Sequence, residues 1–333
     1  MKEIKSIIMA LAISFAAMGC DALRSVSSND VVAQGAPYEL IVVCEQPEWE
    51  GALGDTLRSV LTAPIPYLQQ TEPQFDVLRV TARSYEKLVA RHRNILRCVI
   101  NPDLDNASIA VEYDVHAKPQ IILTLQGPTA ESMTSYVNLH RKAILNVLES
   151  SERDRSVAYA KRFNVLVLEQ LIQEKFGMQM KIPTGYTLRN DLPNFLWASY
   201  EYPTSSQGVF IYSYAATKGA KSLAPEELLA ARNKYAALIP GPSEGSYMTT
   251  YADYAPDIRT FRIKGRLWVE MRGLWEVHGD YMGGPFVSYS TINNYTGEVV
   301  TIDGYVFSPK NPKRNYLRAI EHLLYNVNFI KEE

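Results

Sequence analysis

Residues 286–307, FVSYSTINNYTGEVVTIDGYVF, contain two runs of β-branched and aromatic residues around a short polar segment. The first run ends at Ile292 and the second begins at Val299. The segment from Asn293 to Gly297 supplies the asparagine and glycine that tight turns favour. Two strand-forming runs on either side of such a turn predict an antiparallel hairpin. We therefore expect an antiparallel sheet in the second half of the chain.

The sequence around this hairpin has the same strand-rich character. Residues 178–333 hold 24 aromatic side chains against 11 before them, and 15 of the 21 tyrosines. A helix opens at Pro225 and ends before Pro240, and a closing helix follows Asn311 and Pro312, which suit its first positions. Further strands are predicted near residues 196–202, 209–214, 246–251, 260–263 and 267–271.

The first half of the chain mixes both kinds of element. Residues 38–44, YELIVVC, predict a buried strand, and residues 107–115 and 120–126 predict a hairpin. Helical spacing of apolar residues appears after Glu48, after Ser84, from Thr129 to Val147 and from about Arg153 to Lys175, where Gly177 gives a stop.

This order of elements lacks the regular strand–helix–strand alternation of a doubly wound sheet and predicts an α+β protein. We expect two mixed parts with mainly antiparallel sheets flanked by helices and joined by a long helical segment. The predicted organisation is a signal peptide at 1–19, a flexible tether at 20–37, an N-terminal part at 38–150, a connecting helix at 151–177 and an aromatic-rich C-terminal part at 178–333.

The first residues of the chain have the layout of a secretory signal. Lys2 and Lys5 give a basic start, and residues 7–18 are apolar apart from Ser14. A membrane-spanning helix needs about 20 apolar residues, so this run is too short for one. The sequence therefore predicts an exported protein with no permanent transmembrane helix in this segment.

Residues 17–20, AMGC, follow the apolar run and resemble the lipobox of bacterial lipoproteins. This resemblance implies cleavage before Cys20 and attachment of acyl chains such as palmitate to it. Two or three chains give stable anchoring, because each buried methylene contributes about 0.8 kcal/mol. The alternatives are an ordinary signal peptide followed by a structural cysteine, and a cytoplasmic chain with an apolar start. We expect a lipid-anchored protein of the cell envelope, in the outer membrane.

Two cysteines remain beside Cys20. Cys44 lies in a strand-like run and Cys98 near the end of a helix-like run. In an oxidising compartment a Cys44–Cys98 disulfide is one interpretation, and two separately buried thiols are the other. Neither lies in a CxxC pattern or beside a histidine, so the sequence does not favour a metal or redox role for them.

Four segments resemble a known family: MRGLWEVHGDYMGGPFVSY at 271–289, IDGYVFSP at 302–309, IPTGY at 182–186 and GSYM at 245–248. Together they resemble a family of uncharacterised lipoproteins from the Bacteroidota, and the resemblance covers nearly all of the mature chain. It implies an envelope location. Because the family's function is unknown, it implies no catalytic residue.

The first of these segments also concentrates polar and aromatic groups that suit a ligand contact. Arg272, Trp275, Glu276, His278 and Asp280 offer anion, stacking and proton contacts within nine residues. Their spacing does not match a metal site, so no metal is predicted, and a strand end with a structural turn is the alternative. Next to them, the glycine pair at 283–284 and the following proline suggest a tight turn with positive φ or a close backbone approach.

Composition narrows the function to a few classes. The formal net charge is −2, and no basic block with interleaved aromatics appears, so nucleic acid is not an expected partner. No nucleotide, cofactor or nucleophile motif is present either. We expect a monomeric or weakly associating envelope lipoprotein with a binding or structural role. Its expected partners are the membrane, which it contacts through its lipid, and a glycan or an envelope protein. The alternative is an envelope-attached hydrolase acting on a glycan or peptide polymer, and the sequence leaves open whether the protein is an enzyme.

Overall fold

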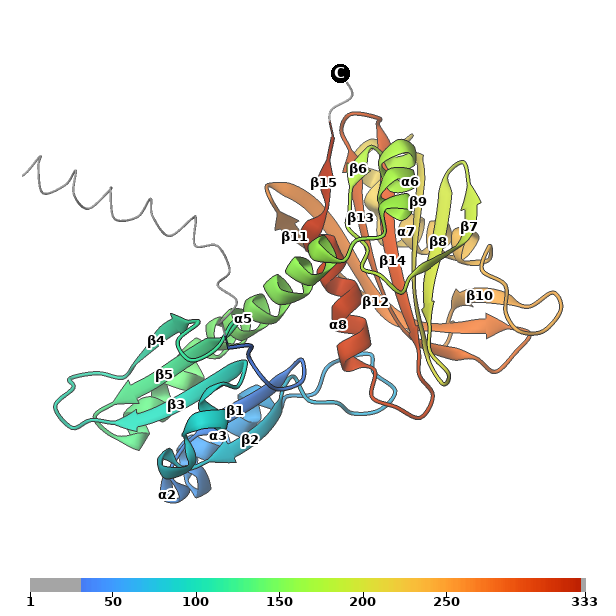
Figure 1. Cartoon of the computed structure of the whole chain (residues 1–333). Helices are drawn as coiled ribbons and strands as arrows, with labels where there is room; N and C mark the ends of the chain where they lie inside the picture. The colour runs from blue at the N-terminus through green and yellow to red at the C-terminus, as the bar shows by residue number, and fades with distance from the viewer. Residues whose placement is uncertain (1–30, 331–333) are drawn as a thin grey trace, which may run out of the picture.

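The computed structural model describes residues 31–330, so the predicted signal peptide, Cys20 and the tether up to residue 30 lie outside the described residues. The described chain forms two sheet-containing domains connected by one long helix, α5 (Ala130–Arg162), and the α+β class is confirmed (Figure 1). We call residues 31–162 the N-terminal domain and residues 163–330 the C-terminal domain. Among residues 31–330 no helix is both long and apolar enough to cross a membrane.

The N-terminal domain contains a five-stranded sheet in the order β2-β1-β3-β5-β4. The hairpin predicted at residues 107–126 is confirmed as the antiparallel pair β4 and β5. The other pairs are parallel, unlike the antiparallel pairing we expected. Helices lie between β1 and β2, and strand β4 lies between β3 and β5, so in each case the chain returns in the same direction. The strands are β1 (Glu39–Val43), β2 (Asp76–Val80), β3 (Asn94–Ile100), β4 (Ser108–Tyr113) and β5 (Ile121–Gly127).

Helices cover this sheet unequally on its two faces. Strand β1 alternates, so that Leu40 and Val42 face the core under α3 and α5, whereas Ile41 and Val43 face the smaller opposite cluster. Leu57 of α3 and Val137 of α5 are fully buried on the first face. The short helices of this domain are α2 (Gln46–Glu50), α3 (Ala52–Leu61), η2 (Ala82–Ser84) and α4 (Lys87–Ala90).

The end of the predicted tether is part of the N-terminal domain. Val32 forms a parallel bridge with Lys118, and Gln34 forms one with His92. The prediction of a tether through residue 37 is therefore wrong for its last residues. Polar composition suggested a free segment, but backbone hydrogen bonds such as Ala33 N–H to Lys118 O (2.9 Å) do not depend on apolar side chains.

Helix α5 is longer than the sequence pattern indicated. Thr129 and Ser132 cap its start reciprocally, and a single non-helical residue, His140, interrupts it. Because residues 130–162 contain no glycine or proline, the helix continues past the predicted boundary at residue 150. The next helix, α6 (Leu166–Phe176), ends at Gly177 in the left-handed conformation (φ 60°), as predicted.

The C-terminal domain is built on an eight-stranded antiparallel sheet with the path β10-β12-β13-β14-β9-β8-β7, and β11 also pairs with β12. The hairpin predicted at residues 286–307 is confirmed, with Ile292 opposite Val299. The strands are β7 (Thr187–Leu192), β8 (Phe195–Glu201), β9 (Ser206–Ala215), β10 (Tyr247–Thr250), β11 (Asp257–Ile263), β12 (Arg266–His278), β13 (Gly283–Asn293) and β14 (Glu298–Phe307).

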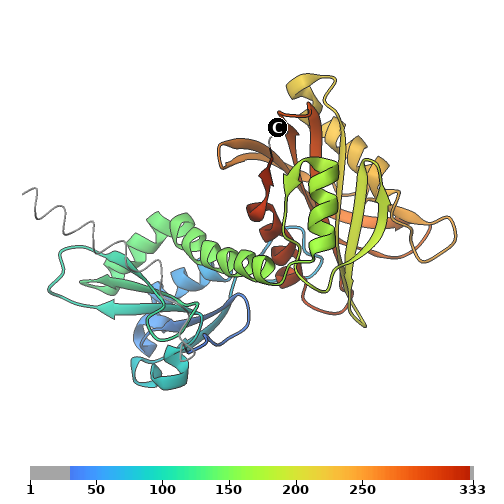
Figure 2. The ribbon, with the colours of Figure 1, turned by 45° about the horizontal axis from the view of Figure 1, so that its top comes forward.

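Helices pack on both faces of this sheet (Figures 1 and 2). Helix α7 (Pro225–Ala236) covers one face, and α6 with α8 (Arg314–Leu323) covers the other. Helix α8 consequently lies between the large sheet and the N-terminal domain. The remaining short elements are β6 (Met178–Gln179), η3 (Gly219–Leu223), η4 (Leu324–Asn326) and β15 (Asn328–Phe329).

Candidate functional site

The N-terminal domain caps the first turn of α8. Glu72, in the loop between α3 and β2, accepts hydrogen bonds from the N–H of Lys313 at 2.6 Å and from the N–H of Arg314 at 2.9 Å. A carboxylate at this position satisfies two otherwise unpaired backbone donors and interacts favourably with the helix dipole. Because Glu72 and α8 belong to different domains, this cap fixes one domain against the other.

The side chain of Arg314 adds a second link between the domains. Its guanidinium donates to both carboxylate oxygens of Asp76, at 3.1 Å and 2.5 Å, and to the carbonyl of Pro73 at 3.0 Å. Paired donation of this kind is the stronger form of a charged hydrogen bond. The cap and this pair together hold the start of α8 on the loop before β2.

Further along α8, charged side chains from both domains form one buried network. Arg272 of β12 donates to both oxygens of Glu270 (2.6 Å and 3.0 Å) and to Glu321 of α8 (2.5 Å). Arg318 donates to Glu321 at 2.9 Å and lies 3.8 Å from Glu149 of α5. The interdomain charge cluster consists of Tyr38, Glu149, Glu270, Arg272, Arg318, Glu321 and His322.

Its closest contacts across the domain boundary involve Tyr38, Glu149 and His322. The hydroxyl of Tyr38 donates to Glu149 at 2.9 Å and lies 3.0 Å from Nε2 of His322. Nε2 of His322 is also 3.2 Å from the same Glu149 oxygen. Tyr38 and Glu149 belong to the N-terminal domain and His322 to the C-terminal domain, so the two rings and the carboxylate meet only when the domains are docked.

The cluster keeps its carboxyl groups ionised. Burial alone would raise the pKa of Glu321, but the charges of Arg272 and Arg318 outweigh it and lower the pKa to about 2. The pKa of Glu149 is also lowered, because the hydrogen bond from His322 and the charge of Arg318 outweigh its burial. Burial raises the pKa of Tyr38, which therefore stays a neutral hydrogen-bond donor.

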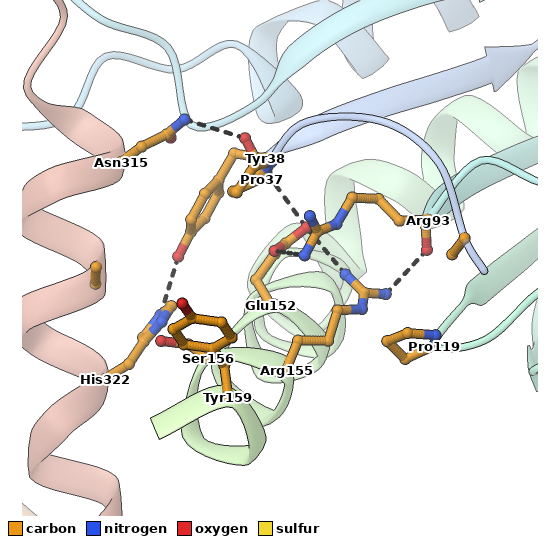
Figure 3. Close-up of a pocket in the computed structure, with 12 residues that line it drawn as sticks. Pro37, Tyr38, Arg93, Pro119, Glu152, Arg155, Ser156, Tyr159, Asn315 and His322 are labelled. Carbon is orange, nitrogen blue, oxygen red and sulfur yellow. Dashed lines mark hydrogen bonds and ion pairs between the residues drawn. The ribbon is translucent and has the colours of Figure 1, made fainter. Parts of the chain in front are cut away.

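A cavity of about 420 Å³ lies beside this cluster, between the domains (Figure 3). We call it the interdomain pocket. Helix α5 supplies one wall, α8 a second, and the chain leading into β1 a third, and Arg93 and Pro119 add the segments before β3 and β5 (Figure 3). Its volume falls in the range of small-molecule sites, which favour domain interfaces. The lining residues are Ala33, Pro37, Tyr38, Arg93, Pro119, Glu152, Arg155, Ser156, Tyr159, Asn315, Ala319 and His322.

Two guanidinium groups share one carboxylate at the base of the pocket. Glu152, almost fully buried, accepts from Arg93 at 2.9 Å, from Arg155 at 2.9 Å and from Asn94 at 2.6 Å. These three charged side chains sum to one positive unit, and the charges of Asp114 and Asp154 also act on Arg155. Burial lowers the pKa of Arg155 to about 10, against the opposing effect of Glu152, so this cation is only partly compensated.

Two buried donors at the pocket, Nε of Arg93 and Nε of Arg155, have no acceptor among the described residues. Nδ1 of His322 is also buried without a hydrogen-bond partner. Buried polar groups are ordinarily paired, so unpaired ones point to an absent ligand or water. Apart from Ser156 and Asn315, the rest of the lining is aromatic, proline or alanine. A molecule with an anionic group and an apolar body matches this combination.

The structure separates Arg272 and Trp275, which the sequence grouped into one candidate site. Side chains alternate along β12, so these two point to opposite faces of the sheet. Arg272 belongs to the interdomain charge cluster. Trp275 is 2% exposed, donates from Nε1 to Val306 O at 3.2 Å and packs edge-on against Tyr305.

The other three candidates lie near the far end of β12. Glu276 and Asp280 line a second cavity of about 610 Å³, which Trp275 also reaches. The carboxylate of Asp280 accepts from Oγ of Ser243 at 2.5 Å. His278 is exposed and its ring packs against Tyr247 at 5.0 Å. The five predicted residues thus occupy three different surroundings.

The glycine pair next to them begins a strand. Gly283 and Gly284 are the first residues of β13, and the positive φ belongs to Gly279 (85°). The expected turn at 283–284 is therefore wrong, and close backbone approach explains the glycines. A Cβ on Gly284 would lie 2.0 Å from the carbonyl oxygen of Val306.

Cys44 and Cys98 are free thiols, so the disulfide considered from the sequence is not formed in this structure. They lie on neighbouring parallel strands, one residue beyond the pair Val43 and Arg97. The two thiols hydrogen-bond, and this bond lowers the pKa of Cys44 and, with burial, raises that of Cys98.

Sequence reasoning missed the interdomain pocket. Its candidate residues did not include His322, Glu152 or Arg155. One signal was available: Arg314, Arg318 and Glu321 follow helical spacing beside the apolar stripe of the closing helix. Charges that border an apolar stripe on the same side indicate a buried polar contact. The residues of the N-terminal domain that Arg314 and Arg318 meet lie more than 150 positions earlier in the chain, and no local pattern indicates that.

No group of three or more metal-ligating side chains with the geometry of a metal site occurs among residues 31–330.

Two family models match the chain. Residues 33–161 match a domain of unknown function, DUF8532, and residues 166–326 match another, DUF4837. The boundary between these matches falls at the break between α5 and α6.

None of the curated proteins compared with the chain matches it. Among solved structures, the Saccharomyces cerevisiae Ran-binding protein Mog1p has a TM-score of 0.30 and 10% identity, covering 46% of this chain and 91% of its own. A point mutant of the protein Mog1 has a TM-score of 0.29 and 8% identity, covering 46% of this chain and 92% of its own.

Proposed function

We propose that the protein is a lipid-anchored component of the cell envelope, in the outer membrane, and that its interdomain pocket binds a small amphipathic molecule with an anionic group. The observation that carries the binding role is the pocket itself. It combines a partly compensated cation, buried donors without acceptors and an apolar wall, all between two domains. The lipid anchor rests on the sequence around Cys20.

The anchor supports this function by confining the protein to a membrane surface. Cys20→Ser should abolish acylation, because the acyl acceptor is lost, and it should leave the described domains folded, because Cys20 lies outside residues 31–330. Mass spectrometry of the mature protein tests this. The expected result is a wild-type chain that begins at an acylated Cys20, and an unmodified wild-type Cys20 would contradict the proposal.

The chemistry of the pocket indicates which end of the ligand lies where. Arg93 and Arg155 lie at the base with Glu152, and an anionic group there would compensate their excess charge. Tyr159, half exposed, stands at the rim, where its ring offers an apolar face. We expect the anionic group beside the two arginines and the apolar body along Tyr159.

A pocket-filling variant tests this proposal. Ser156 lines the pocket and forms no side-chain hydrogen bond among the described residues, so Ser156→Phe fills the cavity with little other change. Ala158, two residues away on the same helix, is exposed, and Ala158→Phe is the matched control. The probe is anilinonaphthalene sulfonate, which has a sulfonate on an aromatic body and fluoresces in apolar surroundings.

We expect the wild type and Ala158→Phe to bind one equivalent of this dye, and Ser156→Phe to bind it at least about tenfold more weakly. Circular dichroism should show all three chains equally folded, so that dye binding reports the pocket. Equal affinity of the wild type and Ser156→Phe would contradict the proposed site.

The geometry favours binding over hydrolysis. A hydrolase needs charged side chains that are free to act on a substrate, whereas Arg272, Glu270 and Glu321 satisfy one another as ion pairs. A general acid needs a pKa raised towards neutral pH. Asp303 has a pKa raised to about 6 by burial, against the effect of Arg232, but it is fully buried beneath α7 and paired with Arg232.

A further inference from the structure

A second cavity, of about 610 Å³, lies at the edge of the C-terminal domain and is separate from the interdomain pocket. We call it the edge cavity. The end of β12 and the start of β13 form one side, and residues after β14 form another. The N-terminal domain closes it with the loop that carries Gln69 and Gln70. The N-terminal domain thus completes a cavity that the C-terminal domain mostly forms.

Aromatic rings stand at this cavity with free faces. Tyr281, in the turn between β12 and β13, is fully exposed, and its hydroxyl has no partner among the described residues. Tyr251 and Phe307 are half-buried and also line the cavity. An exposed tyrosine presented on a tight turn offers a flat apolar face with a polar tip, and sheet packing does not explain its position.

Polar groups with spare hydrogen-bonding capacity lie beside these rings. The carboxylate of Glu276 is half-buried, and no described residue donates a hydrogen bond to it or pairs with it. The amide of Gln69 is exposed and equally unengaged. Lys313 lies on the opposite side, where its ammonium donates to Gln70 Oε1 at 3.3 Å. The cavity therefore offers acceptors and donors around an aromatic face.

We propose that the edge cavity binds a carbohydrate chain of neutral sugar units. The apolar C–H face of a pyranose ring stacks on tyrosine, and neighbouring sugar hydroxyls donate to a carboxylate and exchange hydrogen bonds with amides. Tyr281 provides the stacking face, Glu276 accepts from a pair of hydroxyls, and Gln69 contacts the ring from the N-terminal domain.

The charge of the cavity favours this ligand class over the others. Glu276 and Asp280 contribute two negative charges and Lys313 one positive charge, so an anionic polymer is disfavoured. An extended peptide needs unpaired strand edges for its backbone. At this cavity β12 is paired on both sides, with β10 and with β13. A neutral sugar satisfies the polar groups without either requirement.

Calorimetric titration of the full mature chain with cellohexaose and chitohexaose, two neutral hexasaccharides, tests this site. Tyr281→Ala removes the stacking face, and Glu276→Gln keeps the shape of the side chain and removes its charge. Tyr295→Ala is the control, because Tyr295 is also an exposed tyrosine, in the turn between β13 and β14, and does not line the cavity.

We expect at least one hexasaccharide to bind the wild type and Tyr295→Ala equally, and to bind Tyr281→Ala at least about tenfold more weakly. Glu276→Gln should weaken binding by a smaller factor. Ser156→Phe should leave sugar binding unchanged, so this site and the interdomain pocket can fail independently. Absence of binding by both sugars, or equal binding by Tyr281→Ala, would overturn the proposal.

Discussion

Glu321 shows how much of this structure depends on single buried charges. Its carboxylate pairs with both Arg272 and Arg318, and each oxygen accepts from one of them. Removing one partner from a buried ion pair costs about 3–5 kcal/mol, because the remaining charges stay buried without compensation. Glu321 compensates two arginines at once, and we therefore expect it to be among the most sensitive positions of the chain.

We predict that Glu321→Gln lowers the free energy of unfolding at neutral pH by about 3–5 kcal/mol. Because the folded-state pKa of Glu321 is about 2 and its ordinary value is 4.5, the contribution of its charge is fully present above pH 4.5 and is lost as the pH falls towards 2. The stability difference between wild type and variant should shrink over that range.

Urea unfolding at several pH values measures this difference. Glu244→Gln is the control, because Glu244 is exposed and has no partner among the described residues. It should change stability by less than about 0.5 kcal/mol. A Glu321→Gln variant as stable as the wild type at neutral pH would show that the cluster does not hold the fold together.

At the scale of elements, the sequence predicted what local patterns control. The hairpin at residues 286–307 and the stop of α6 at Gly177 follow from turn and cap residues, and both were found. The parallel pairing of β1 with β3 was not predicted, because strands distant in sequence choose their partners through packing. Side chains alternate along a strand, so a strand predicted to continue through both Arg272 and Trp275 would have placed them on opposite faces. The predicted strand ended near residue 271.

The prediction at the scale of elements concerns strand β13. A Cβ on Gly284 would clash with the backbone of β14, so Gly284→Ala should lower the free energy of unfolding by about 3 kcal/mol. Gly297 has a positive φ of 72° and open space around it, and Gly297→Ala should cost about 1 kcal/mol from backbone strain alone. Thermal denaturation of both variants compares the two costs, and a smaller loss for Gly284→Ala would contradict the close packing described for these strands.

At the scale of the whole molecule, the two domains behave as one unit because α8 packs on the large sheet and also contacts the N-terminal domain. Glu72 caps the helix from the N-terminal domain, and His322 reaches Glu149 of α5. Both pockets lie along this boundary. The sequence could not indicate this arrangement, because the residues that meet are separated by more than 150 positions and carry no shared pattern.

We predict that the wild type unfolds in a single calorimetric transition. Arg314→Met removes the two bonds to Asp76 and the bond to Pro73, and it should cost about 2 kcal/mol and begin to separate the domain transitions. Arg58→Met, which breaks an exposed pair with Asp55, should cost less than about 1 kcal/mol. Two transitions in the wild type would contradict the view that docking is part of the native fold.

The crystal structure of the mature chain with anilinonaphthalene sulfonate tests the central claim most directly. The account predicts one dye molecule in the interdomain pocket, with its sulfonate in hydrogen-bond contact with Arg93 or Arg155 and its aromatic body against Tyr159. Dye bound only elsewhere, with the pocket filled by water, would contradict the claim that this pocket is the ligand site.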